Sequence, residues 1–235
     1  MGKDNFCLPI PSKPIENDRV KLVHFDLEKY GAELVEQSRP HPHVWNYLPN
    51  GPYESFEPLH EWFRTTVHPD PAFYPFAILD KTKLDPTSGE PRLAGMASLI
   101  NSSLQHLKSE VGYIMILPEF QRTHVTSNMV GLLLHYTLDL PERGGLGLRR
   151  MQWIADERNE PSVNAAKRLG YSFEGVARWD RVLAEGKPAK DVKLRSGDPR
   201  AACPGRNTTS LSISWEDWEL HGVREKVDAL MARKF

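Results

Sequence analysis

Residues 110–130 read Glu110-Val-Gly-Tyr-Ile-Met-Ile-Leu-Pro-Glu-Phe-Gln-Arg-Thr-His-Val-Thr-Ser-Asn-Met-Val130, and the rest of the chain is arranged around them. The run 111–117 is short, apolar and contains several β-branched residues, which predicts a buried strand. Pro118 ends the run, and a mainly polar turn follows at 121–126. From Met129 the apolar residues recur with the period of a helix that packs by one face, at Leu132, Leu133, Tyr136 and Leu140. The stretch therefore predicts a strand, a tight turn and a helix in direct succession.

A helix that begins directly after a tight turn has backbone N–H groups without partners in its first turn. These donors and the helix dipole both favour a negatively charged ligand, such as a phosphate group. The turn at 121–126 is therefore a candidate phosphate-binding site.

The pattern Ile114-x-Ile116-x-Pro118-Glu119-x-Gln121-Arg122-x-x-Val125 resembles the acetyl-CoA-binding motif of the GNAT superfamily of N-acyltransferases. In that family the turn usually has the pattern Gln/Arg-x-x-Gly-x-Gly/Ala, whereas His124 and Thr126 occupy the positions of the small residues here. This variant of the motif resembles the one found in the RimJ/RimL-like branch. The larger side chains must point away from a bound phosphate, because glycine leaves room that they fill.

Two further segments strengthen the resemblance. Residues 159–175 resemble the family pattern Asn-x-x-Ser…Leu-Gly-Phe-x-x-Glu-Gly, and residues 45–52 with 61–62 resemble the substrate side of the RimJ/RimL-like branch. The three segments occur in the family's order between residues 19 and 215. The resemblance implies an α/β fold with a mixed, centrally antiparallel twisted sheet flanked by helices and a strand–turn–helix acetyl-CoA site.

The resemblance also implies which residues bind acetyl-CoA. The backbone of Ile114 and Ile116 would bind the pantetheine arm, and the N–H groups of residues 122–127 would bind the pyrophosphate. Asn159 would contact the cofactor arm, act as an ordinary helix cap, or do both. The expected cofactor-binding residues are Ile114, Ile116, Gln121, Arg122, Thr123, His124, Val125, Thr126, Ser127, Asn159 and Ser162.

Acetyl transfer to an amine needs a group that removes a proton and a group that returns one to the thiolate. Glu110 opens the cofactor strand, where the family often places a carboxylate base, and Asp156 is the alternative; a lone Glu at a strand end is otherwise a solvated edge charge. Many relatives use a Tyr as the acid, but Ala166 stands at the matching position. Ser162, Tyr171 or a water molecule are the remaining candidates.

Four aromatic residues between positions 45 and 62 either line an acceptor pocket or belong to an ordinary core: Trp45, Tyr47, Tyr53 and Trp62. The expected reaction moves an acetyl group from acetyl-CoA to a primary amine by direct attack, because neither Cys7 nor Cys203 falls in a motif. A small amine is favoured as the acceptor. The alternatives are protein N-termini, or a non-catalytic acyl-CoA-binding sensor.

The 235 residues suffice for one domain, expected at 19–235, after an extended proline-containing arm at 1–18 and with a mobile loop at 185–208. Thirty basic and 31 acidic residues argue against a nucleic-acid partner. No apolar run is long enough to span a membrane and no signal peptide is evident, so a cytoplasmic monomer or homodimer is expected. His41 and His43 lack a third ligand at a suitable spacing, so no metal is expected.

The remaining periodic segments predict the other elements. Strands are expected at 19–23, 73–79, 93–100, 151–155, 172–183 and 210–214, and helices at 27–38, 59–66, 159–170 and from 217 to the C-terminus. Asp26 is the expected cap of the first helix, and a hairpin connection is expected at 81–92.

Overall fold

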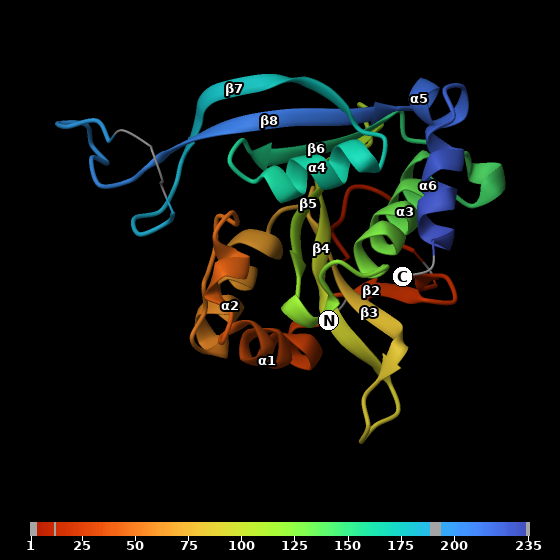
Figure 1. Ribbon diagram of the computed structural model, residues 1–235, viewed down its shortest axis with the longest axis horizontal. Helices are drawn as coiled ribbons and strands as arrows, with labels where there is room; N and C mark the ends of the chain where they lie inside the picture. Colours follow the sequence, from red (N-terminus) through yellow and green to blue (C-terminus); the bar gives the residue numbers. More distant parts are fainter. Residues whose placement is uncertain (1–3, 12, 189–193, 234–235) are drawn as a thin grey trace.

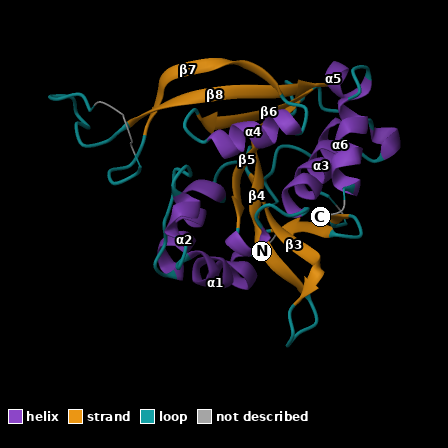
Figure 2. Cartoon of the chain, viewed as in Figure 1, coloured by secondary structure: helices purple, strands orange, loops and turns teal. Residues whose placement is uncertain are grey.

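The computed structural model describes residues 4–11, 13–188 and 194–233, which form one twisted sheet with helices packed on it (Figure 1, Figure 2). The strand order is β1-β2-β3-β4-β5-β6-β8-β7, and only β5 and β6 run parallel. The predicted mixed, centrally antiparallel sheet is confirmed. The strands are β1 (Ile15–Glu16), β2 (Val20–His24), β3 (Tyr74–Leu84), β4 (Pro91–Ser103), β5 (Lys108–Ile116), β6 (Arg150–Asp156), β7 (Ser172–Val182) and β8 (Gly205–Ser214).

Six α-helices lie within the described residues, joined by short helical turns. The helices are α1 (Leu27–Ser38), α2 (Phe56–Trp62), α3 (Val125–Leu138), α4 (Glu160–Arg168), α5 (Trp215–Glu219) and α6 (Val223–Ala232). The turns are η1 (Pro42–Trp45), η2 (Phe63–Val67), η3 (Pro118–Phe120) and η4 (Pro141–Arg143). No helix in the described part of the chain is long and apolar enough to cross a membrane.

The sheet divides where β5 meets β6. These strands pair only at Lys108–Arg150, Ser109–Met151 and Glu110–Gln152, and they separate beyond that point. In Figure 1 the strands up to β5 form one half of the sheet, while β6, β8 and β7 cross above them in a different direction. The divergence leaves the second half of β5 without a strand partner on its β6 side.

A β-bulge interrupts β5 at the point of divergence. Gly112 pairs with Ser98 and Met115 with Met96, so two residues of β5 face one of β4. Tyr113 within the bulge has φ +48°, in the left-handed region, and its ring packs 4.9 Å from the ring of Phe73. A bulge bends its strand and increases the twist. Here it turns the end of β5 away from β6.

Helix α3 begins at Val125, a few residues earlier than its apolar period predicts, and ends at Leu138. It is buried on most sides rather than on one face. Gly131 permits this on the α6 side, because a Cβ there would lie 2.2 Å from the Sδ atom of Met231. The predicted apolar contact at Leu140 falls outside the helix, and that side chain is exposed.

The local capping signals are confirmed. Asp26 caps α1, its carboxylate accepting from the N–H groups of Glu28 and Lys29 at 3.0 and 3.3 Å. The helix spans Leu27–Ser38, as its sequence predicts. The predicted C-terminal helix is instead two helices, α5 and α6, because Gly222 adopts φ +76° between them.

Two segments differ from their sequence interpretation. The side chains of Phe6 and Leu8 are buried, although the segment 1–18 is predicted to lie outside the core. Strand β8 begins at Gly205, five residues before the predicted strand, because its first residues pair with β7 through Gly205–Val182 and Arg206–Arg181. Part of the predicted loop at 185–208 is therefore strand, and residues 189–193 lie outside the described residues.

Candidate active site

A cavity of about 770 Å³ lies where β5 and β6 diverge. Its walls come from β5, β6, α4, the start of α3, the segment 43–49, and the facing ends of β7 and β8. The cavity therefore joins the predicted cofactor motif to residues more than 50 positions away in both directions along the chain.

Glu110 lies in the cavity wall, at the last residue pair that joins β5 to β6. The residue is 3% exposed, and the Asn101 side chain donates a 2.8 Å hydrogen bond to its Oε2 atom. Burial raises the pKa of Glu110 to about 7, against the opposing effects of Asn101 and of the nearby charges of Arg181 and Arg206. A carboxyl group with that pKa accepts and releases a proton near neutral pH.

Asp156, the alternative base, also lines the cavity but is already paired. Arg158 donates to both carboxylate oxygens, from Nε at 2.9 Å and from a terminal nitrogen at 2.7 Å. Burial acts to raise the pKa of Asp156, but the hydrogen bonds and charge of Arg158 outweigh it and hold that pKa below its usual value. Asp156 is therefore the weaker proton acceptor of the two.

The end of β5 presents Ile114 and Ile116 to the cavity. Leu117 donates its N–H to the carbonyl of Ala94 on the β4 side, so alternation along the strand directs the backbone groups of Ile116 away from β4. The carbonyl of Ile116 accepts a 2.9 Å hydrogen bond from the side chain of Gln121. The backbone of Ile116 thus lies at the free edge of β5, with its carbonyl oxygen partly occupied by the protein itself.

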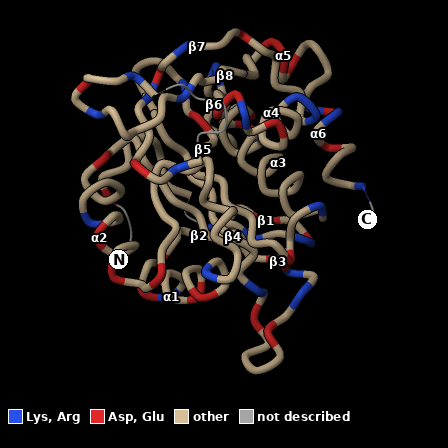
Figure 3. Tube along the Cα trace, turned by 60° about the vertical axis from the view of Figure 1, so that its left-hand side comes forward, with Lys and Arg blue, Asp and Glu red and all other residues tan. Residues whose placement is uncertain are grey.

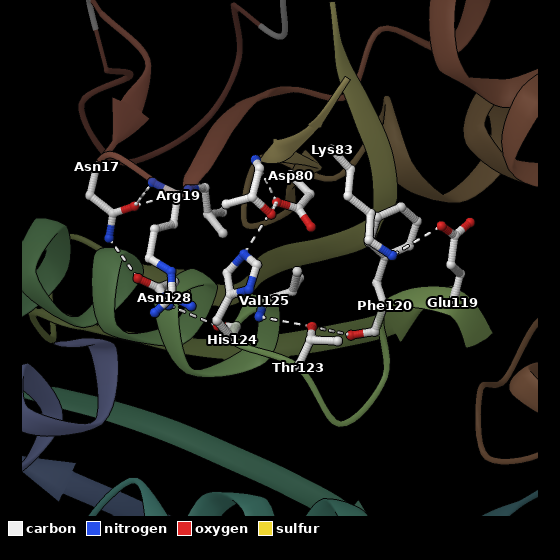
Figure 4. Close-up of polar contacts among 12 residues, drawn as sticks. Asn17, Arg19, Asp80, Lys83, Glu119, Phe120, Thr123, His124, Val125 and Asn128 are labelled. Atoms are coloured by element: carbon white, nitrogen blue, oxygen red, sulfur yellow. Dashed lines mark hydrogen bonds and ion pairs between the residues drawn. The ribbon is translucent and has the colours of Figure 1, made fainter. Parts of the chain in front are cut away.

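The turn before α3 is anchored from behind (Figure 4). His124 is 7% exposed, is not among the residues that line the cavity, and points toward β3, with its Nε2 atom 3.2 Å from Oδ1 of Asp80. The same Asp80 oxygen accepts from the N–H and hydroxyl of Thr82 at 2.9 and 2.7 Å. His124 therefore occupies the position of a small residue without filling the space in front of the helix, and its side chain is not a cavity residue.

Most of the predicted cofactor-binding residues of the turn lie at the cavity. Gln121, Arg122, Thr123, Thr126 and Ser127 line the cavity. Arg122 adopts φ +60°, a conformation that glycine accepts without strain and other residues adopt at a cost of about 1 kcal/mol.

Val125 was predicted to bind the cofactor, but it is not among the residues that line the cavity. Its side chain is fully buried, and its N–H donates to Thr123 Oγ1 at 3.3 Å. The Thr123 hydroxyl in turn donates to the carbonyl of Phe120 at 2.6 Å. Val125 therefore closes the turn rather than facing the cavity.

Asn159 and Ser162 bring the start of α4 to the opposite wall. Asn159 caps the helix by accepting from Ser162 N–H at 3.3 Å. The indole N–H of Trp153 on β6 donates to Ser162 Oγ at 3.0 Å, which leaves the hydroxyl hydrogen of Ser162 free for another acceptor. Trp153 is a site residue that the sequence interpretation missed.

Tyr171, a candidate acid, is not among the residues that line the cavity. It is 3% exposed, its ring packs 5.5 Å from Trp153, and its hydroxyl has no hydrogen-bond partner among the described residues. Ala166, at the position where relatives carry the Tyr, is fully buried. The geometry thus favours Ser162 over Tyr171.

Only one of the four aromatic acceptor candidates lines the cavity. Tyr47 does so, and its hydroxyl donates to the carbonyl of Arg158 at 3.2 Å. Trp45 and Tyr53 pack edge to face, 5.0 Å apart, inside the core, and Trp62 packs against Tyr113 at 5.3 Å. Trp45 and Tyr53 are therefore buried core residues and Trp62 is partly buried against the core, so none of these three predicted pocket residues lines the cavity.

Sequence interpretation also missed the cavity arginines of β7 and β8, Arg181 and Arg206. Arg206 lies in the segment that was predicted to be a loop, so no strand period marked it. The rings of His41 and His43 meet edge to face with their centroids 6.0 Å apart, and the described residues include no group of three potential metal ligands.

Comparisons with known proteins agree with this geometry. The model of the acetyltransferase (GNAT) domain family matches residues 19–172. The spermidine N(1)-acetyltransferase of Escherichia coli (strain K12) is 26% identical over 149 residues, covering 63% of this chain and 72% of that protein.

Two solved structures illustrate the fold. A GCN5-related N-acetyltransferase from Brucella melitensis superposes with a TM-score of 0.74 at 24% identity, covering 95% of this chain and 88% of that chain. A spermidine N-acetyltransferase from Vibrio cholerae in complex with CoA and spermine gives a TM-score of 0.60 at 17% identity, covering 86% and 99%. At these identities the structural likeness establishes the fold.

Proposed function

This chain belongs to the GNAT acetyltransferase family, and on that premise we propose that it transfers an acetyl group from acetyl-CoA to the primary amine of a small molecule. Enzymes of this family use acetyl-CoA as the acetyl donor. Direct attack of the amine is proposed, with Glu110 as the base and Ser162 as the acid.

One observation carries the proposal. The cavity between β5 and β6 brings the start of α3, the free edge of β5 and the buried carboxyl of Glu110 into one space. A pantetheine arm needs an extended backbone to pair with, and a pyrophosphate needs donors at a helix start. The transfer itself needs a base within reach of the amine. All three requirements meet here.

The residues of the cavity fit acetyl-CoA. Thr126 and Ser127 stand at the start of α3, where N–H groups lack helical partners, and Arg122 adds a cation beside them. His124 is turned toward Asp80, so its bulk does not block the anion site. When bound, acetyl-CoA supplies the thioester whose acetyl group is transferred.

Glu110 is proposed to take the proton from the attacking amine. A pKa of about 7 suits this step, because an appreciable fraction of the carboxyl is ionised at neutral pH and still basic. As the new N–C bond forms, the C–S bond breaks and the sulfur needs a proton. The Ser162 hydroxyl, held from its oxygen side by Trp153, is proposed to pass a proton to the sulfur and to regain one from water, while the proton taken by Glu110 is released to solvent.

A small amine is favoured as the acceptor because relatives by sequence are named as spermidine acetyltransferases. We assign the chain to the RimJ/RimL-like branch because of the residue pattern of the motif at 114–125. We also infer that residues 19–235 fold as one domain, since β8 lies between β6 and β7 in the single sheet. Figure 3 shows basic and acidic residues interleaved along the described chain, and 30 basic against 31 acidic residues give no basic excess of the kind a nucleic-acid binder has.

The test is calorimetric titration of the purified protein with acetyl-CoA, followed by an amine panel scored by release of free thiol. The panel contains amino acids, amino alcohols, polyamines and a peptide with a free N-terminus. Binding followed by thiol release with a small amine is expected. Release with the peptide alone would favour protein N-termini as acceptors, and binding without release from any amine or from cell-extract amines would favour a non-catalytic sensor.

A further inference from the structure

Arg206 is a buried cation in the cavity wall, and one nitrogen of its guanidinium group has no hydrogen-bond partner among the described residues. It lies at the second position of β8, is 6% exposed, and lines the cavity. Its Nε atom has no hydrogen-bond partner within the described part of the chain. Burying a charged group without compensation is costly, so such a group marks a place where a ligand completes the site.

A second arginine stands beside it. Arg181 of β7 is the direct register partner of Arg206, so the two side chains project from the same face of the sheet. The pair Asp156–Thr208 lies two residues further along β8 and shares that face. Arg181 has one ion pair, to Asp180 at 3.3 Å, and both of those side chains are partly exposed.

The charges that line the cavity as a whole do not cancel. In the described chain, the carboxylates that line the cavity are Glu110 and Asp156, whereas its arginines number five: Arg122, Arg168, Arg181, Arg206 and Arg233. Asp156 is already neutralised by the two hydrogen bonds from Arg158. No free carboxylate besides Glu110 is thus available in the described cavity wall to hold a second ammonium group of a polyamine.

The arginine pair is also separate from the proposed phosphate site. The phosphate site belongs to the turn before α3, whereas Arg206 and Arg181 belong to β8 and β7 on the far side of β6. Both guanidinium groups are close enough to Glu110 for their charges to act on its carboxyl. Arg181, Arg206 and Glu110 also line the same cavity.

We propose that the acceptor is a small amine that also carries an anionic group, a carboxylate or a phosphate, which Arg206 and Arg181 bind while the amine faces Glu110. The proposal rests on the proposed acetyltransferase function and names its acceptor class. Planar guanidinium groups bind such oxyanions through paired hydrogen bonds, which fix the orientation of the ligand as well as its charge. Polyamines, which carry only positive charges, would be repelled by the same pair.

The test compares matched acceptors by thiol release from acetyl-CoA. β-Alanine is paired with 3-aminopropanol, phosphoethanolamine with ethanolamine, and spermidine is measured beside them. The expected result is that kcat/KM for an anionic amine exceeds that for its neutral partner by about 10-fold or more. The two pairs distinguish a carboxylate from a phosphate.

The variant Arg206→Gln should reduce that anionic-to-neutral ratio by about 10- to 100-fold, the effect of losing a charge-assisted hydrogen bond. Using the ratio within one variant removes any general effect of the substitution on Glu110. Arg206→Lys should recover part of the ratio, because it keeps the charge without the paired geometry. Arg178→Gln, an exposed arginine of β7 outside the cavity lining, is the matched control and should leave the ratio unchanged.

Three outcomes would overturn the inference. Spermidine or the neutral amines could outperform every anionic amine, which would leave the acetyltransferase function standing. Arg206→Gln could weaken acetyl-CoA binding by calorimetry more than about 10-fold, which would place Arg206 against the cofactor. Absence of thiol release with every amine would remove the proposed function itself, and the acceptor assignment with it.

Discussion

At the scale of single residues, burial changes the Glu110 carboxyl in two ways. It raises the pKa to about 7, which suits a base at neutral pH. It also makes the ionised form costly in the folded state, because the nearest hydrogen-bond donor recorded for the carboxylate is the single amide of Asn101. The first effect serves the proposed chemistry and the second lowers stability, and each can be measured separately.

Glu110→Gln should abolish most of the turnover while leaving acetyl-CoA binding intact. Loss of a general base typically costs about 10²- to 10⁴-fold in rate. In the wild-type protein kcat should rise with pH through about 7, as the carboxyl ionises, and the variant should lack that limb. Thiol release between pH 5 and 9 measures both. Glu142→Gln, an exposed glutamate of η4, is the control, and unchanged turnover in Glu110→Gln would remove Glu110 from the mechanism.

The same substitution should stabilise the protein at alkaline pH. Burial raises the pKa of Glu110 from 4.5 to about 7, so between these values the folded state holds a proton that the unfolded state has lost. Stability from this group therefore falls as pH rises from about 4.5 to about 7. At pH 8 the Gln variant should gain about 1–3 kcal/mol in free energy of unfolding.

Urea unfolding at pH 5 and pH 8 measures the difference. The gain should be much smaller at pH 5, where the wild-type carboxyl is protonated in the fold. A Gln variant less stable than wild type at pH 8 would contradict the assigned cost of burying the charge.

At the scale of elements, different residues of the turn before α3 anchor the turn to the sheet and line the cavity for the proposed cofactor. His124→Ala removes the contact with Asp80 behind the turn, so it should lower the free energy of unfolding by about 1–2 kcal/mol. Because that side chain is not among those that line the cavity, the Kd for acetyl-CoA should change less than about 3-fold. Thermal unfolding and calorimetry give the two numbers.

Arg122→Ala provides the opposite pattern in the same turn. Arg122 lines the cavity, so its loss should weaken acetyl-CoA binding by about 5- to 10-fold through the lost charge beside the helix start. Its effect on stability should stay within about 1 kcal/mol. If His124→Ala weakened binding as much as Arg122→Ala, the imidazole would have to face the cavity.

The elements also show which parts of the site could be predicted. Asp26 and Asn159 were recognisable as caps because the hydrogen bonds of a cap join residues two or three positions apart. The orientation of the Trp45 side chain could not be predicted, because strand alternation and helical period give no information on the direction of side chains in an irregular segment. Arg206 was missed for a related reason. Its segment becomes a strand only through pairing with β7, a contact that a local pattern does not contain.

At the scale of the whole molecule, Lys187 joins the segment that follows β7 to the segment 45–50, far away in the sequence. The residue follows β7, yet its Nζ atom donates to the carbonyls of Trp45 and Asn50, both at 2.9 Å. One wall of the cavity contains Tyr47, next to those carbonyls, and the other contains Arg181 of β7. Lys187 therefore ties the segment that contains Tyr47 to the segment that follows β7, and we expect this link to support the acceptor side of the cavity.

Lys187→Met keeps most of the apolar stem and removes the donors. It should lower the free energy of unfolding by about 1–3 kcal/mol, because two carbonyls lose their partner. It should also raise KM for the acceptor more than KM for acetyl-CoA, since the cofactor residues lie on β5, α3 and α4. Lys13→Met, an exposed lysine, is the control. Equal rises in both KM values would mean that Lys187 supports the fold in general rather than the acceptor side.

The pH dependence of stability provides an independent check of the bridge that Lys187 forms to the carbonyls of Trp45 and Asn50. Burial lowers the pKa of Lys187 from 10.5 to about 8, so between these values the unfolded state holds a proton that the folded state has lost. Stability from this group therefore rises as pH increases from about 8 to about 10.5. The neutral amine still has two N–H groups for the two carbonyls, so the bridge survives deprotonation. Urea unfolding should show this rise in the wild-type protein and its absence in Lys187→Met; the same rise in both would place the titrating group elsewhere.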